Sequence, residues 1–206
     1  MTPTLDPLIP LVLLEAVRTV DLPEGELEAE FVEELRSKRF GLSDTVLAQI
    51  RRYREAVKRS QRPPTDEAIG IARLIGRRAD AEAVFREAGR MVARQTYARV
   101  AAPTRRLLLI LPALFARPLA LRQIRRISER YLGGKVWRVG ASIHLEVRES
   151  VTRDTAPKLA GCTFYEAALR ELMQRLVAGV GAVEHVRCGT RGEGTCEWRA
   201  AWRGSR

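Results

Sequence analysis

Apolar residues recur at helical spacing through the first half of the chain. The spacing predicts an acidic helix over residues 24–38 and a second helix from about Asp44 to Ser60. The proline pair at 63–64 ends the second helix, and Thr65 begins a third. A fourth helix is predicted over about residues 80–100. We therefore expect an N-terminal helical region at residues 1–78 and a second domain at 79–206.

An unusually apolar stretch, Leu107–Phe115, follows the fourth helix. It contains Pro112, and Pro118 is expected to open a further helix that ends near Gly133. A kinked element that is apolar nearly all round is typical of a buried position. The stretch is therefore a candidate wall of a pocket.

The pattern changes to period two after residue 134. The alternation predicts one hairpin from residues 135–139 and 142–149 and another from residues 182–188 and 195–203. An amphipathic helix over 163–178 separates them, with Thr163 and Glu166 as its capping box. His144 falls on the polar face of the first hairpin, which predicts a surface residue. The expected fold is α+β, with N-terminal helices followed by a four-stranded antiparallel sheet and packed helices.

The cysteines of the chain lie near its C-terminus and form, with one histidine, the pattern C-x22-H-x2-C-x7-C. The residues are Cys162, His185, Cys188 and Cys196. Sulfur and imidazole donors in this number suit a four-coordinate structural zinc. Two alternatives stay open at this point, namely a disulfide between Cys188 and Cys196 and three free thiols that fill the core.

The position of the fourth ligand raises a geometric difficulty. In a straight strand, His185 and Cys188 point to opposite faces and lie about 10 Å apart. A shared metal requires a bulge or early turn near Val186 and Arg187, or else Glu184 replaces His185 as the ligand.

Three segments resemble the 4-vinyl reductase domain family, which is related to haem-NO-binding-like and TRAPP-like domains. They are Gly161-Cys-Thr-Phe-Tyr-Glu166, His185-Val-Arg-Cys188 and Gly192-Glu-Gly-Thr-Cys-Glu-Trp198, and the resemblance covers about residues 135–203. It implies an α+β fold around a hydrophobic pocket, a ligand-sensing role, and a zinc held by cysteines and an acidic residue. The implied cysteine ligands fall on Cys162, Cys188 and Cys196, and His185 is the nearest candidate for the fourth.

A formal net charge of +11 introduces a nucleic-acid alternative. Arg51, Arg52 and Arg54 lie on the second helix, which is followed by a turn and a third helix, as in a helix-turn-helix. The arginines are nevertheless spread along the whole chain, so a docking or dimerisation unit with a solvated arginine face is the favoured interpretation. We expect a homodimer.

Catalytic and targeting motifs are not evident. The sequence contains no Walker loop, no G-x-G-x-x-G and no G-x-S-x-G elbow. The apolar stretch Leu5–Val17 contains Asp6, two prolines and Glu15, unlike a leader. The run Leu107–Leu114 is too short for a membrane helix. We expect a cytoplasmic protein without a membrane partner and without enzymatic activity.

The leading hypothesis is a non-catalytic sensor or carrier with a structural zinc. It would enclose a small hydrophobic ligand, of aromatic or tetrapyrrole-related type, between the helices of residues 107–131 and the sheet. The candidate lining residues, each of which could instead be plain core, are Phe115, Trp137, Phe164, Tyr165 and Trp198. The alternative function is a DNA-binding or adaptor protein that uses the basic N-terminal helices.

Overall fold

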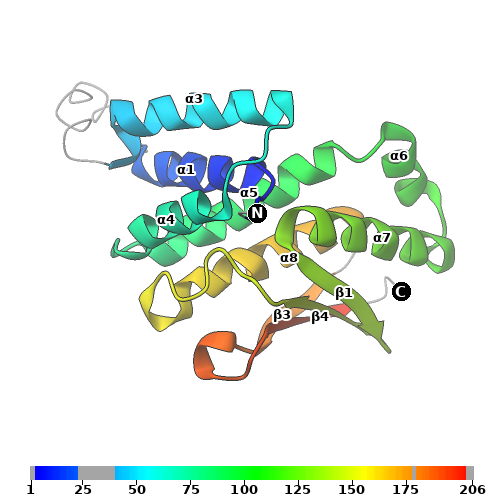
Figure 1. The fold of residues 1–206 in the computed structure, drawn as a ribbon. Helices are drawn as coiled ribbons and strands as arrows, with labels where there is room; N and C mark the ends of the chain where they lie inside the picture. The colour runs from blue at the N-terminus through cyan, green and yellow to red at the C-terminus, as the bar shows by residue number, and fades with distance from the viewer. Residues whose placement is uncertain (1–2, 23–39, 178–179, 203–206) are drawn as a thin grey trace.

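A computed structural model describes residues 3–22, 40–177 and 180–202 (Figure 1). These residues form seven α-helices and a four-stranded antiparallel sheet, which confirms the predicted α+β class. The helix predicted over 24–38 and the ends predicted at Gly179 and Arg203 lie outside the described residues.

The N-terminal helices surround α1 (Leu8–Asp21), whose side chains are buried on nearly every face. It packs against α3 (Asp44–Arg59), α4 (Thr65–Gly76) and α5 (Ala81–Ala98), and the short turn η2 (Phe40–Leu42) covers its end. Ser43 caps α3 by accepting a hydrogen bond from the Val46 N–H at 3.4 Å. The predicted helices at 44–60, 65 onward and 80–100 are thus confirmed within a few residues.

An ion pair joins the end of α1 to the connection between α4 and α5. The Arg78 guanidinium reaches Asp21 at 2.5 Å and Asp80 at 2.7 Å, and Asp21 also accepts from the Gly41 N–H at 2.7 Å. One hydrophobic core includes residues from both sides of the boundary predicted after residue 78. The two predicted regions therefore share a core.

The sheet has the strand order β1-β2-β4-β3, with all neighbours antiparallel. Its strands are β1 (Gly134–Val139), β2 (Ser142–Val147), β3 (Val180–Arg187) and β4 (Cys196–Trp202). Pairing of β2 with β4 joins the two predicted hairpins into one sheet. In β4 the alternating residues Cys196, Trp198, Ala200 and Trp202 are buried, as the sequence pattern predicts.

The middle layer consists of α5 and α8 (Thr163–Leu176), and α8 lies between α5 and the sheet (Figure 1). Their contact is the most extensive between two helices of the described chain. It requires a very close approach at Gly89, where a Cβ atom would lie 2.2 Å from the Phe164 carbonyl oxygen. Glycine is therefore a packing requirement at this position.

Two expectations from the sequence are wrong at the apolar stretch 107–115. Helices α6 (Ala102–Ile110) and α7 (Ala113–Ile127) form a projecting hairpin, and α7 begins before Pro118 instead of at it (Figure 1). A π-helical turn, Ser128–Leu132, continues α7. Because only one side of this hairpin faces the protein, four apolar side chains of the stretch are 60–81 % exposed, namely Leu109, Ile110, Leu114 and Phe115.

His144 is not the surface residue that the strand pattern predicts. Its side chain is only 16 % exposed, and its Nδ1 lies 2.8 Å from a carboxylate oxygen of Glu197. Its ring stacks on Trp137 with centroids 5.4 Å apart. Trp137 on β1 and Glu197 on β4, the two neighbouring strands, therefore cover the His144 side chain.

Within the described ranges, no helix is both long enough and apolar enough to cross a membrane.

A pair of glycine substitutions tests the α5–α8 contact. Gly89→Ala should lower the free energy of unfolding by about 1–3 kcal/mol, because the added methyl group collides with the α8 backbone. Gly70→Ala, on α4 with open space around its Cβ position, should raise it by about 0.5–1 kcal/mol. Urea titration measures both. Equal effects of the two substitutions would contradict the packing described here.

Candidate metal centre and adjacent pocket

The four residues of the cysteine and histidine pattern come together at one end of the sheet. One ligand atom from each of Cys162, His185, Cys188 and Cys196 lies within 4.8 Å of the others. The sulfur atoms of Cys162 and Cys188 are 3.9 Å apart, well beyond a disulfide bond of about 2.05 Å. All three cysteines are free and buried. The cluster is compatible with a metal site. The structure does not form the alternative Cys188–Cys196 disulfide, and free buried thiols also agree with the alternative of three core cysteines.

A bulge in β3 brings His185 and Cys188 to the same side. His185 pairs with Trp198 and Arg187 pairs with Glu197, so Val186 is an extra residue that has no partner on β4. The bulge lies where the sequence analysis required one. The alternative ligand Glu184 is wrong, because its carboxylate is 56 % exposed and pairs with Arg199 at 2.6 Å.

Cys162 reaches the cluster from the turn that precedes α8. The turn η4 (Pro157–Cys162) packs so closely on the preceding loop that a Cβ at Gly161 would lie 1.9 Å from the Thr152 carbonyl oxygen. The Thr152 hydroxyl donates to the Gly161 carbonyl at 2.6 Å. Glycine before Cys162 is thus needed for close packing.

The predicted capping box at the start of α8 is wrong. The Thr163 hydroxyl donates to the Ala160 carbonyl at 2.7 Å, and Glu166 pairs with Arg170 at 2.8 Å instead of reaching back. Thr163 is already helical, and the preceding 3-10 turn runs directly into α8. The backbone therefore continues from turn to helix without the extended residue that a capping box needs.

A second layer of contacts fixes the ligands. The Gly189 N–H donates to the Cys196 sulfur at 3.3 Å, and the Cys188 N–H donates to Glu193 at 2.5 Å. The His185 ring stacks on Trp198, with centroids 4.7 Å apart and planes within 8°. In metal sites, contacts of this kind hold the coordinating side chains in the orientation that the metal requires. The sequence does not single out Gly189 and Glu193, because only the folded turn brings the Gly189 N–H to the Cys196 sulfur and the Glu193 carboxylate to the Cys188 N–H.

The thiols influence one another's ionisation. Hydrogen bonding to Cys162 lowers the pKa of Cys196 well below its ordinary value against the cost of burial, and His185 and the Gly189 N–H add to the effect. The pKa of Cys162 is raised, because it shares its proton with Cys196 and is buried. These surroundings favour the thiolate form of Cys196, which is the form of cysteine that binds metals.

The aromatic residues expected to line a pocket are dispersed. Phe164, Tyr165 and Trp198 pack together in the core beside the cluster, with ring centroids about 5 Å apart. Trp137 lies on the edge strand β1, and Phe115 is 60 % exposed on α7. Phe164 and Tyr165 contact a separate hollow beside residues 3–6 and 129–133.

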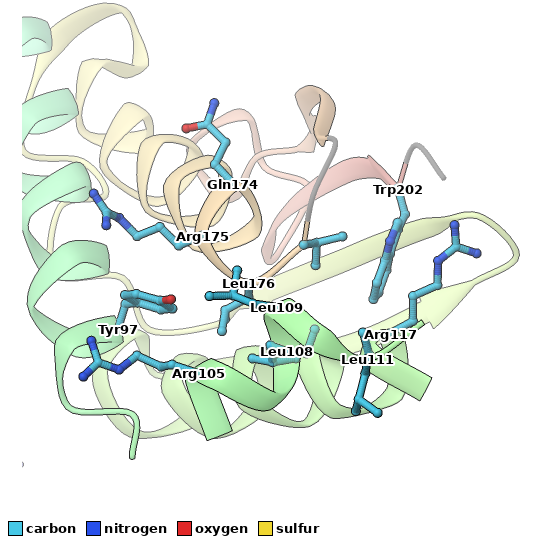
Figure 2. A pocket seen from close by; sticks show the side chains of 13 residues that line it. Tyr97, Arg105, Leu108, Leu109, Leu111, Arg117, Gln174, Arg175, Leu176 and Trp202 are labelled. Atoms are coloured by element: carbon cyan, nitrogen blue, oxygen red, sulfur yellow. The ribbon is translucent and has the colours of Figure 1, made fainter. Parts of the chain in front are cut away.

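The pocket in Figure 2 has other walls, provided by α5, α6, α7, α8 and the end of β4. Its volume is about 250 Å³. Apolar side chains dominate one part of its wall, with Leu108 on α6, Leu176 on α8 and Trp202 on β4. Leu108, Leu109 and Leu111 belong to the stretch Leu107–Phe115, and their place in the wall agrees with the prediction that this stretch is a pocket wall.

The three arginines considered for nucleic-acid binding differ in their surroundings. Arg52 pairs with Glu67 on α4 at 2.8 Å, and Arg54 pairs with Glu15 on α1 at 2.8 Å. Arg51 is exposed. Two of the three guanidinium groups therefore neutralise carboxylates within the helical unit.

No protein-family model matches the chain, and comparisons with curated proteins and with solved structures find no match either. The resemblance to the 4-vinyl reductase domain family stays a prediction.

Adjacent residues on β3 provide a matched test of the fourth ligand. His185→Asn should weaken Co²⁺ binding by at least about 100-fold, since loss of a direct ligand should exceed the 10–100-fold cost of losing a second-layer contact. Glu184→Gln should leave the affinity unchanged. Visible absorption of the Co²⁺-loaded protein measures both. The reverse ranking of the two variants would exclude His185 as a ligand.

Proposed function

We propose that this protein is a non-catalytic binder of a small hydrophobic ligand, in which a structural zinc fastens the β3–β4 hairpin to the start of α8. The observation that carries the proposal is the cluster of three buried cysteines and one partly buried histidine, with ligand atoms within 4.8 Å of one another. The pocket between α6, α7 and α8 supplies the ligand site.

The donor set favours zinc. Zinc binds thiolate sulfur at about 2.3 Å in a tetrahedron, which places two sulfurs about 3.8 Å apart. The Cys162 and Cys188 sulfurs are separated by 3.9 Å. Calcium and magnesium prefer oxygen ligands, whereas thiolate and imidazole suit zinc. When bound, the ion would be held by Cys162, His185, Cys188 and Cys196.

Four protein ligands support a structural role for the metal. Catalytic zinc sites keep one position for water or substrate, and a set of three cysteines and one histidine leaves none. All three cysteines are buried, and the rings of Tyr165 and Trp198 pack beside them. The three cysteines are therefore shielded from water, and the aromatic rings stabilise the position of the cluster against the sheet.

The metal cluster and the pocket lie at opposite ends of the same two elements. Helix α8 follows Cys162 and ends at Leu176, which lines the pocket. Strand β4 begins at Cys196 and ends at Trp202, on the opposite pocket wall. A metal that fixes the first residues of α8 and β4 therefore fixes the relative position of two pocket walls. The ligand-sensing role implied by the resemblance to the 4-vinyl reductase domain family agrees with this arrangement.

Metal analysis tests the zinc proposal. Protein purified without added metal should contain about one zinc per chain. Cys188→Ser combined with Cys196→Ser should remove the zinc and lower the melting temperature, because metal binding contributes directly to folding free energy. Thr195→Ser, next to Cys196, is the control and should keep the zinc. Purified protein that contains no zinc, or a melting temperature that stays the same when a chelator removes the zinc, would contradict a structural zinc.

A cavity-filling substitution tests the ligand site. Ala116→Trp adds a large side chain at the pocket wall and should reduce the affinity for the neutral probe 1-naphthamide by at least about tenfold, by occupying its space. Ala102 is exposed on α6 and lies outside the wall, so Ala102→Trp should leave the affinity for 1-naphthamide unchanged. Naphthalene fluorescence during titration gives both affinities. Unchanged binding in Ala116→Trp would place the probe elsewhere.

A further inference from the structure

The wall of the pocket carries a strong positive charge. Arg105, Arg117 and Arg175 line it, and none of its described wall residues is acidic. Of these arginines, only Arg175 forms an ion pair within the described part of the chain, with Glu171 at 2.8 Å. Glu171 also pairs with Arg94 at 3.1 Å, so one carboxylate is shared between two guanidinium groups. The pocket therefore has an excess of cations over anions.

Arg105 is the pocket arginine that has an unsatisfied buried hydrogen-bond donor. Its Nε atom is buried and has no hydrogen-bond partner. Its guanidinium carbon lies 5.7 Å from the centre of the Tyr97 ring, a cation–π contact that provides no acceptor for the Nε–H donor. Native proteins pair nearly all of their buried donors, so an unpaired one beside a cavity indicates an absent acceptor.

Two of the cations lie on either side of the same aromatic ring. Figure 2 shows Tyr97 between Arg105 and Arg175, and Arg175 is also 5.7 Å from the ring centre. At the other end of the pocket, Arg117 lies 5.8 Å from the Trp202 ring. The Tyr97 ring separates the Arg105 and Arg175 guanidinium groups, and an anion bound beside Arg105 would offset the positive charge of this wall.

The size of the pocket limits the anion. A cavity of about 150 Å³ admits benzene, so the volume of about 250 Å³ here admits one or two fused rings or a compact aliphatic chain. The leucine side chains and Trp202 provide apolar contacts for such a body. A guanidinium group binds a carboxylate through two parallel hydrogen bonds.

We propose that the ligand is a compact hydrophobic carboxylate, with its carboxylate bound by Arg105 and its apolar body against Leu108, Leu176 and Trp202. This inference rests on the proposed function, since it assigns a chemical class to the ligand of the same pocket. It adds that charge, as well as hydrophobicity, selects the ligand.

Two probes of the same shape and different charge test the inference. Isothermal titration calorimetry should show 1-naphthoate binding at least about tenfold more tightly than neutral 1-naphthamide at low salt. Arg105→Gln should abolish this preference while leaving naphthamide binding intact. Arg106→Gln, exposed on the same helix and outside the pocket wall, should leave the preference unchanged.

The outcomes separate the inference from the proposed function. Equal binding of the two probes to the unmodified protein, or a preference that survives in Arg105→Gln, overturns the inference and leaves the hydrophobic pocket in place. Failure of both probes to bind overturns the proposed function and the inference with it. If Arg106→Gln loses the preference for naphthoate as Arg105→Gln does, the preference comes from general surface charge. That result also overturns the inference.

Discussion

The bulge at Val186 is the constraint on which the metal cluster depends. In a regular strand, His185 and Cys188 would face opposite sides of the sheet, about 10 Å apart. The extra residue in β3 has no partner on β4 and turns the following backbone, so both side chains face Cys162 and Cys196. The His185 ring then stacks on Trp198, which ties its orientation to the middle of the sheet. A local irregularity in one strand thus determines whether four distant residues can share one ion.

Helix α8 and strand β4 connect the metal cluster to the pocket. Both elements start at the cluster, and the residues at their far ends line the pocket. A 14-residue helix is about 21 Å long, so the metal proposed at one end acts on the pocket through rigid secondary structure. The close α5–α8 contact at Gly89 holds the helix from the other side. Metal binding and ligand binding should therefore stabilise the same arrangement of elements.

The cluster could be predicted because cysteine and histidine are scarce in this chain and shared coordination requires a particular geometry. That geometry also predicted the bulge. The pocket could be predicted only in part: three leucines of the expected wall at 107–115 line it, but apolarity alone does not reveal which side of α6 and α7 faces the protein. The capping box at Thr163 failed because a 3-10 turn leads directly into α8, a feature that residue preferences do not specify. Helix α1 is the truly buried apolar element, although its prolines and Glu15 obscured the pattern.

Zinc K-edge X-ray absorption on the purified protein tests the central claim most directly, because it reports the atoms bound to the metal. The account predicts three sulfur neighbours at about 2.3 Å and one nitrogen neighbour at about 2.0 Å, without an oxygen from water. A site with fewer than three sulfurs, or with a bound water oxygen, would contradict a closed structural centre built from Cys162, His185, Cys188 and Cys196.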